Sequence, residues 1–308
     1  MTQALIDIGS NSMRLTVYDI SEDGRFKILF REKIMAGLAG YVSGSILTAE
    51  GIECACGGLI AFKETLDALG IGNIAVFATA SLRNISNTEA ARNAILSETG
   101  FAVDVISGEE EAMFGYAGTM QELEVSSGAF MDIGGASTEL TVFDGGKILS
   151  AASIPIGSLL LYREYVKNII PGDGSIKRIQ KAIADAFEQK YRFPSDGSNP
   201  LVCAGGTARA ALKLAKRMFD ISNECYSITM EQLSGLCRRL SRGDREAMDM
   251  VLKLEPDRIH TIVPGLLIMQ YVCHEFKTRE LIVCKYGVRE GYLCQKLLPT
   301  MNIRKTVN

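Results

Sequence analysis

Apolar and polar residues follow the same pattern in two separate stretches of the chain. Residues 5–8 and 130–133 are apolar apart from one aspartate each, and both runs lead into a turn of small residues. Residues 13–19 and 138–144 then mix apolar with polar side chains in near alternation. This pattern predicts a buried strand, a tight turn and a second strand, which together form a β-hairpin at each place.

The two stretches are copies of one another. Leu5–Asp19 aligns without gaps with Phe130–Asp144, at a spacing of 125 positions. The identical pairs are Asp7/Asp132, Ile8/Ile133, Gly9/Gly134, Ser12/Ser137, Leu15/Leu140, Thr16/Thr141, Val17/Val142 and Asp19/Asp144. Such an internal repeat indicates a duplicated unit. We therefore expect two similar domains whose hairpin tips face one central cleft.

Between and after the copies, segments with helical spacing alternate with short β-type runs such as Ile74–Ala78 and Val103–Ile106. This alternation predicts an α/β fold of mixed sheets with helices, and a length of 308 residues fits two domains. We place the boundary near residue 125, which gives domains 1–125 and 126–308. The last helix, from about residue 290, could pack back on the first domain. The loop at 193–200 is the clearest break in the second half.

The composition is that of an ordinary globular protein, with 47% hydrophobic and 22% charged residues. No apolar run approaches the roughly 18 residues of a spanning helix, and the N-terminus does not resemble a signal peptide, so we expect a cytoplasmic protein without a membrane partner. A net charge of −3 gives no general attraction for nucleic acid. The eight cysteines form no CxxC pairs, and we interpret them as reduced thiols.

The hairpin tips, Asp7–Ser12 and Asp132–Thr138, carry the first candidate chemistry. Their small residues let backbone N–H groups approach phosphate oxygens, and their hydroxyls can add hydrogen bonds. Asp7 and Asp132 end apolar strands, where a bound Mg²⁺ would relieve the cost of burying a carboxylate. Each aspartate could instead accept N–H bonds from its own turn. The matched pair favours the metal.

Three consecutive glutamates follow the predicted strand-to-helix turn at Ser107. With Ser107 as N-cap, Glu110 completes a capping box, and Glu109 in the first turn interacts favourably with the helix dipole. Glu111 lies about 100° further round the helix and could point into the cleft as the base that activates water. A solvated carboxylate explains its position equally well.

Arg83 follows the predicted strand Ile74–Ala78 and precedes a second predicted capping box, Ser86–Glu89. A guanidinium at a strand end can bind a phosphate through two hydrogen bonds. Taken alone, such an arginine is more often one partner of a surface ion pair.

Together these motifs resemble those of the Ppx/GppA family of exopolyphosphatases and guanosine pentaphosphate phosphohydrolases. They occur in the family's order and approximate spacing over nearly the whole chain: Asp7–Ser12, Ala78–Arg83, Ile106–Ala112, Asp132–Glu139, Pro155–Gly157, Gly205–Thr207, Pro264–Gly265 and Tyr286–Gly291. The resemblance implies the actin-like, sugar-kinase and Hsp70 superfold, with two duplicated ribonuclease H-like domains. This agrees with the internal repeat.

The resemblance also implies roles for particular residues. Glu111 would be the general base, Arg83 would assist catalysis, and Asp7, Asp132 and Glu139 would bind Mg²⁺, with Mn²⁺ as an alternative. The implied phosphate contacts are Gly9, Ser10, Asn11, Ser12, Gly134, Gly135, Ser137 and Thr138. The family often dimerises, so we expect a homodimer. The apolar segment Ile262–Val272 could contribute to it, although burial in the core explains that segment equally well.

The activity expected from the resemblance is Mg²⁺-dependent hydrolysis of the terminal phosphate of inorganic polyphosphate, with guanosine pentaphosphate (pppGpp) as the alternative substrate. A base-binding pocket would separate the two, and Gly205–Thr207 with the following helix is where we expect it. A kinase-like ATPase and a non-catalytic polyphosphate or ppGpp sensor are more distant alternatives. Two departures from the family concern substrate binding. Ala136 replaces a usual glycine and could narrow the phosphate turn, and Met35–Gly40 lacks the usual charged residues.

Overall fold

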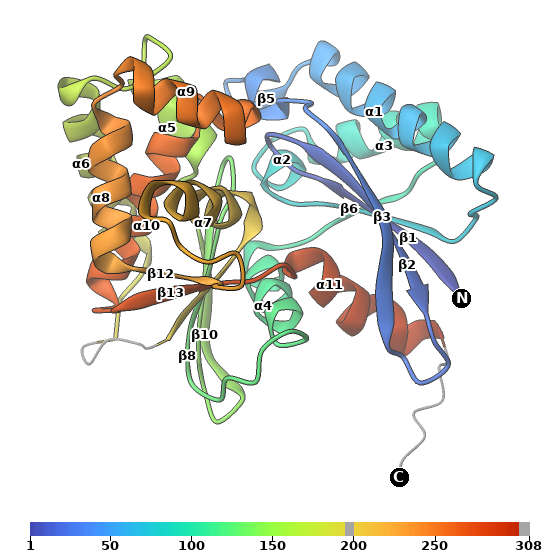
Figure 1. Cartoon of the computed structure of the whole chain (residues 1–308). Coiled ribbons are helices and arrows are strands. Elements are labelled where there is room, and N and C mark those ends of the chain that lie inside the picture. Colours follow the sequence, from blue (N-terminus) through green and yellow to red (C-terminus); the bar gives the residue numbers. More distant parts are fainter. Residues whose placement is uncertain (195–199, 302–308) are drawn as a thin grey trace. The chain divides into compact units, whose positions relative to one another are not determined.

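The computed structural model describes residues 1–194 and 200–301 (Figure 1). The chain divides into two compact units: unit 1 comprises Met1–Glu110 and the segment from Tyr292 onward, and unit 2 comprises Glu111–Gly291. This division falls within helix α4 (Gly108–Thr119). The boundary expected near residue 125 stays a prediction, and most of the expected loop at 193–200 lies outside the described residues.

Unit 1 is built on a five-stranded sheet in the order β3-β2-β1-β6-β7. β1 pairs antiparallel with β2 and parallel with β6, so the predicted first hairpin is confirmed, with Asp7 opposite Arg14. The strands are β1 (Thr2–Ile8), β2 (Met13–Ile20), β3 (Phe26–Ile34), β6 (Ile74–Ala78) and β7 (Val103–Val105), with a small β4–β5 ribbon (Val42–Ser43, Ile46–Leu47) after the 3₁₀ turn η1 (Leu38–Tyr41). The helices before α4 are α1 (Ala49–Ala68), α2 (Ala80–Arg83) and α3 (Thr88–Thr99).

The two faces of the unit 1 sheet have different coverings. Ile6 and Ile8 belong to the hydrophobic core formed with α1 and α3. Since successive side chains of a strand point to opposite faces, Asp7 lies on the other face. Phe77, the neighbour of Asp7 on β6, stacks there on Tyr292, with 4.7 Å between ring centroids. The segment that returns to unit 1 at Tyr292 therefore covers the face that carries Asp7.

Unit 2 repeats the same sheet. Its order is β10-β9-β8-β11-β13-β12, and the first five strands correspond in order and direction to those of unit 1. This confirms the duplication predicted from the repeat and the mixed α/β character. The strands are β8 (Gly128–Ile133), β9 (Thr138–Asp144), β10 (Lys147–Ile154), β11 (Leu201–Ala204), β12 (Ser227–Thr229) and β13 (Glu280–Val283).

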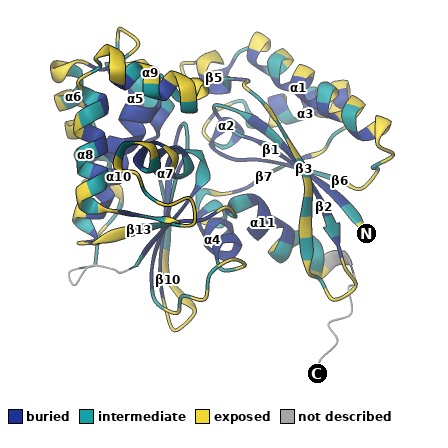
Figure 2. Cartoon of the chain, viewed as in Figure 1, coloured by how far each residue is buried: buried dark blue, intermediate teal, exposed yellow. Residues whose placement is uncertain are grey.

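The helices of unit 2 pack mainly on one face of this sheet. They are α5 (Ser158–Tyr165), α6 (Asp173–Lys190), α7 (Gly205–Phe219), α8 (Met230–Ser241), α9 (Arg245–Leu254) and α10 (Ile262–Glu275), with the 3₁₀ turn η2 (Pro256–Arg258) before α10. α11 (Val288–Tyr292) runs from unit 2 into unit 1, where the π-helical turn η3 (Leu293–Leu297) and the 3₁₀ turn η4 (Leu298–Met301) follow it. Figure 2 shows α10 buried along most of its length. The apolar segment Ile262–Val272 is thus part of the core. Within the described part of the chain, no helix is both long and apolar enough to cross a membrane.

Helix α4 lies over the opposite face of the unit 2 sheet. The Thr141 hydroxyl of β9 donates to the Ala112 carbonyl of α4 at 3.0 Å, and a Cβ on Gly115 would overlap the Phe130 ring of β8. Phe130 and Thr141 are direct cross-strand partners, so both mark the same face. Asp132 and Glu139, two residues along each strand, share that face.

α4 also packs backbone against backbone on α11. A Cβ on Gly118 would overlap the Gly287 carbonyl, and a Cβ on Gly291 would overlap the Phe114 carbonyl. Only glycine allows two helices to approach this closely.

We predict that Gly118→Ala lowers the free energy of unfolding by about 1–3 kcal/mol, because the added methyl meets a backbone carbonyl that cannot move independently. Urea unfolding measures the change. Gly57→Ala in α1 is the matched control, since its Cβ would enter open space. Equal stabilities of the two variants would contradict the close contact of α4 and α11.

Candidate active site

The turns at the two hairpin tips make the same hydrogen bonds. Gly9 N–H donates to the Ser12 carbonyl at 3.2 Å, and Gly134 N–H donates to the Ser137 carbonyl at 2.9 Å. The tips therefore have the same local conformation, as the sequence repeat predicted.

Both turns also direct their carbonyls to neighbouring backbone. In unit 1, the N–H groups of Gly37 and Ala39 donate to the carbonyls of Asn11 and Ser10, each at 2.9 Å. In unit 2, the N–H groups at the start of α5 (Ser158, Leu159 and Leu160) donate to the carbonyls of Gly134 and Gly135, at 2.9–3.0 Å.

The remaining N–H groups of these turns can donate hydrogen bonds to an anion. Across residues 1–194 and 200–301, no acceptor is recorded for the N–H groups of Ser10 and Asn11 in unit 1, or of Gly135 and Ala136 in unit 2. Turns whose carbonyls are satisfied and whose N–H groups are available form concave sites for phosphate oxygens.

The hydroxyls at these turns differ in burial and in hydrogen bonding. Thr138 is fully buried and donates to the Ile156 carbonyl at 2.7 Å, and Ser137 is 2% exposed. In unit 1, the Ser12 hydroxyl accepts from Arg14 Nε at 3.4 Å. The roles of Ser137 and Thr138 as phosphate contacts stay predictions, and Thr138 contributes to holding the turn in place. The methyl of Ala136 is also buried.

Two carboxylates stand side by side in unit 2. Asp132 on β8 and Glu139 on β9 are direct cross-strand partners, whose Cβ atoms lie roughly 5 Å apart in such pairs. Glu139 is 1% exposed, and its Oε1 accepts from the Ser153 hydroxyl at 2.7 Å. Two neighbouring carboxylates repel each other in a buried setting unless cations compensate them.

The donor set fits a magnesium ion held by few protein ligands. In the described part of the chain, no three His, Cys, Asp or Glu side chains come together as a metal cluster. Mg²⁺ is commonly bound by one or two carboxylates together with water and substrate phosphates. Asp132 and Glu139 match that pattern within unit 2.

Arginines beside Asp132 were not identified from the sequence. A Cβ on Gly205, which has φ +80°, would overlap the Asp132 carboxylate, and a Cβ on Gly206 would overlap the Arg258 guanidinium. The side chains of Asp132 and Arg258 thus lie against the backbone of Gly205–Gly206. The base-binding pocket expected at Gly205–Thr207 and the following helix stays a prediction.

The same region contains a second arginine, Arg209, one turn further along α7. Burial, reinforced by the positive charge of Arg289, lowers the pKa of Arg209 to about 10, while the charge of Asp132 acts in the opposite direction. Burial also lowers the pKa of Arg258, again opposed by nearby carboxylates including Asp132. Asp132 therefore has the positive charges of Arg209 and Arg258 close by.

α4 begins as predicted. Ser107 N–H donates to Glu110 Oε2 at 2.8 Å and Glu110 N–H donates to Ser107 Oγ at 3.1 Å, so the capping box is confirmed. Glu109 is exposed and Glu111 is half-buried. The helix that bears Glu111 thus packs on the same sheet face of unit 2 that carries Asp132 and Glu139.

Arg83 ends the short helix α2 in unit 1. Its Nη1 donates to the Ile106 carbonyl at 3.3 Å, which brings the guanidinium to the segment that leads into α4. The predicted capping box at Ser86–Glu89 is wrong. α3 begins at Thr88, and the side-chain amide of its N-cap residue, Asn87, instead bonds both backbone groups of Leu47, each at 3.0 Å.

The predicted site residues therefore form two groups. Unit 1 holds Asp7, Gly9, Ser10, Asn11, Ser12 and Arg83, and unit 2 holds Glu111, Asp132, Gly134, Gly135, Ser137, Thr138 and Glu139.

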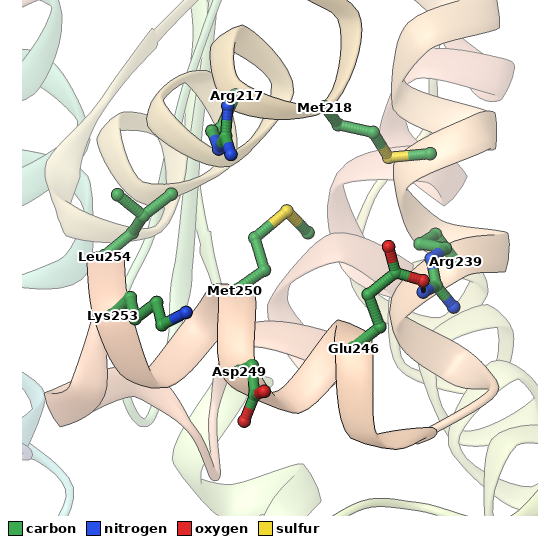
Figure 3. A pocket seen from close by; sticks show the side chains of 8 residues that line it. All are labelled: Arg217, Met218, Arg239, Glu246, Asp249, Met250, Lys253 and Leu254. Atoms are coloured by element: carbon green, nitrogen blue, oxygen red, sulfur yellow. Dashed lines mark hydrogen bonds and ion pairs between the residues drawn. The ribbon is translucent and has the colours of Figure 1, made fainter.

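A separate cavity of about 490 Å³ lies among α7, α8 and α9 in unit 2 (Figure 3). Its lining includes Arg217 and Met250, and Arg239 within it is ion-paired with Glu246 at 2.5 Å. None of the predicted site residues lines this cavity. It is distinct from the candidate active site.

Residues 16–300 match the model of the Ppx/GppA phosphatase family. The chain belongs to this family. The membership inferred from the motifs is thus confirmed, and so is the assignment to a family of phosphatases.

Named relatives of this Ppx/GppA chain have two kinds of activity. Exopolyphosphatase 1 of Mycobacterium tuberculosis is 24% identical over 96% of this chain and 88% of its own length. The guanosine-5'-triphosphate,3'-diphosphate pyrophosphatase of Pseudoalteromonas translucida is 28% identical over 98% of this chain but only 61% of its own length.

Solved structures establish the fold. The Aquifex aeolicus Ppx/GppA family member is 25% identical, with a TM-score of 0.77, and the match covers 97% of this chain and 98% of that one. An exopolyphosphatase from Cytophaga hutchinsonii gives a TM-score of 0.81 at 22% identity, covering 95% and 96% of the two chains. The chain has the two-domain actin-like fold of this family, as expected.

We predict that Gly205→Ala displaces the Asp132 carboxylate and destabilises unit 2. The variant combines the strain of a left-handed residue, about 1–2 kcal/mol, with the steric cost of the overlap, about 1–3 kcal/mol. Gly100→Ala is the matched control, because Gly100 has a similar φ of +77° but open space around a Cβ. Urea unfolding compares the two, and equal losses would show that the Asp132 contact carries no cost.

Proposed function

We propose that this chain is an exopolyphosphatase, which hydrolyses the terminal phosphate of inorganic polyphosphate. The observation that carries the proposal is the matched pair of turns, each with its carbonyls bonded elsewhere and its N–H groups available for phosphate oxygens. A polyphosphate chain presents many such oxygens. The Asp132–Glu139 pair and the neighbouring arginines add the charges that phosphoryl transfer requires.

In this mechanism the chain mainly positions groups. Glu111 accepts a proton from the attacking water, and Arg83 stabilises negative charge on the transferred phosphoryl group. The turn at Gly9–Ser12 and the turn at Gly134–Ser137 bind phosphate oxygens through backbone N–H groups.

Asp132 and Glu139 hold Mg²⁺ in this proposal, with Mn²⁺ as an alternative. Asp7 stays the third predicted ligand. When bound, the ion neutralises phosphate charge and polarises the phosphoryl group.

The 5'-phosphohydrolysis of pppGpp is the second candidate, because one relative carries a name for that reaction. Both substrates end in a phosphoanhydride, so the same residues serve both. Phosphate release from tripolyphosphate and from pppGpp, measured on one preparation, separates the two activities.

We predict that Glu111→Gln lowers kcat for phosphate release at least ~10²-fold, the usual contribution of a general base. EDTA is expected to abolish the wild-type reaction. Glu109→Gln is the matched control, since Glu109 lies in the first turn of the same helix and is exposed. A wild-type level of release by Glu111→Gln would remove Glu111 from the mechanism. A wild-type protein that binds polyphosphate but releases nothing would favour the sensor.

We predict that Glu139→Gln raises the Mg²⁺ concentration for half-maximal activity by roughly tenfold or more. Mutating residues that only hydrogen-bond to a metal ligand already lowers metal affinity by about 10–100-fold. A magnesium titration of phosphate release measures it. Asp144→Asn is the matched control, because Asp144 ends the same strand but is exposed. An unchanged magnesium requirement in Glu139→Gln would exclude Glu139 as a ligand.

A further inference from the structure

α4 contacts the segment from Gly287 to Lys296 at three positions. Gly118 contacts Gly287 and, one turn back along α4, Phe114 contacts Gly291. One further turn back, Glu110 Oε1 lies 3.7 Å from Lys296 Nζ.

Helices α4 and α11 each contain one point at which the chain passes between the units. The first passage lies between Glu110 and Glu111, and the second lies between Gly291 and Tyr292. The glycine contacts belong to unit 2, and the Glu110–Lys296 contact belongs to unit 1.

A polar network in unit 1 includes the Glu110–Lys296 contact. Asp104 Oδ2 accepts from Tyr292 Oη at 2.8 Å and from Lys296 Nζ at 2.7 Å. Lys296 also reaches Glu110, whose other oxygen caps α4 by accepting from Ser107 N–H. We call these four side chains, Asp104, Glu110, Tyr292 and Lys296, the Asp104 network.

The electrostatics of the Asp104 network favour its hydrogen bonds. Burial opposes the charge of Lys296, but the hydrogen bond and negative charge of Asp104 outweigh burial and raise the Lys296 pKa. Burial, together with the hydrogen bond to Asp104, raises the pKa of Tyr292. At neutral pH both side chains therefore keep the protonated form that donates to Asp104.

We propose that the Asp104 network positions Glu111, with Lys296 as its central residue. Glu111 directly follows Glu110, whose carboxylate is held by both the capping box and Lys296. Holding Glu110 in place holds the first turn of α4, from which Glu111 projects. This inference rests on the proposed role of Glu111 as the base, and it assigns Lys296 a positioning role.

The network suits fine positioning better than global stability. The Lys296 and Glu110 side chains are each 38% exposed, and partly exposed ion pairs contribute at most about 1 kcal/mol to folding. Misplacing a reacting group by 1 Å, in contrast, can cost about 10²-fold in rate. Loss of the network should therefore lower the rate more than the stability.

We predict that Lys296→Met lowers kcat for tripolyphosphate hydrolysis roughly tenfold while KM stays within about twofold, because substrate binding does not use this side chain. Lys296→Arg keeps the charge and is expected to recover most of kcat. Hydrogen exchange of the Glu110–Ala112 amides is expected to become at least severalfold faster in Lys296→Met and to stay near wild type in Lys296→Arg.

Lys63→Met is the matched control, because Lys63 makes a similar exposed ion pair with Asp67, at 2.8 Å, on α1 of unit 1. It is expected to leave kcat and the α4 amides unchanged. Wild-type kcat or unchanged amide exchange in Lys296→Met would overturn the inference, as would an equal effect in Lys63→Met. If the wild-type protein releases no phosphate, the proposed function fails, and the amide exchange still decides whether Lys296 holds the start of α4.

Discussion

The hydrogen bond that closes each hairpin tip, from Gly9 to Ser12 and from Gly134 to Ser137, is the interaction on which the candidate site depends. It reverses the chain within four residues and turns the carbonyls of the tip toward neighbouring backbone. The remaining N–H groups then face the opposite way. In the proposed mechanism these N–H groups bind phosphate oxygens, and the side chains of the turn only need to be small.

The architecture around these tips follows from strand periodicity. An aspartate between apolar residues on a buried strand must face away from the main core, because side chains alternate. In unit 1 that face is covered by the returning segment at Tyr292, and in unit 2 it is covered by α4. In each unit, the sheet face that carries the carboxylates therefore packs against a helical segment near a chain crossing.

The sequence predicted most features that depend on local pattern. The duplication, both hairpins and the α4 capping box could be identified because each depends on residues close together in the chain. The capping box at Ser86 failed because Asn87 bonds Leu47, which lies 40 positions away. The arginines near Asp132 could not be predicted from the sequence either, because Arg258 approaches Gly206 only when η2 packs near the start of α7. The pair Gly205–Gly206 could be identified in the sequence, but two glycines do not show which side chains lie against them.

Unit 1 is formed by two separate parts of the chain, Met1–Glu110 and the segment from Tyr292 onward. Unit 2 is an insertion into unit 1, and its entry and exit are neighbours, tied by Lys296 and Glu110. The last described residues are therefore not an appendage of the second half but a structural element of the first. Cutting the chain after Gly291 would leave unit 2 whole and would strip unit 1 of the aromatic ring that covers Phe77. Conversely, unit 2 could be exchanged for that of a relative by joining the new segment at two points, after Glu110 and before Tyr292. The path of the chain through unit 1 would stay the same.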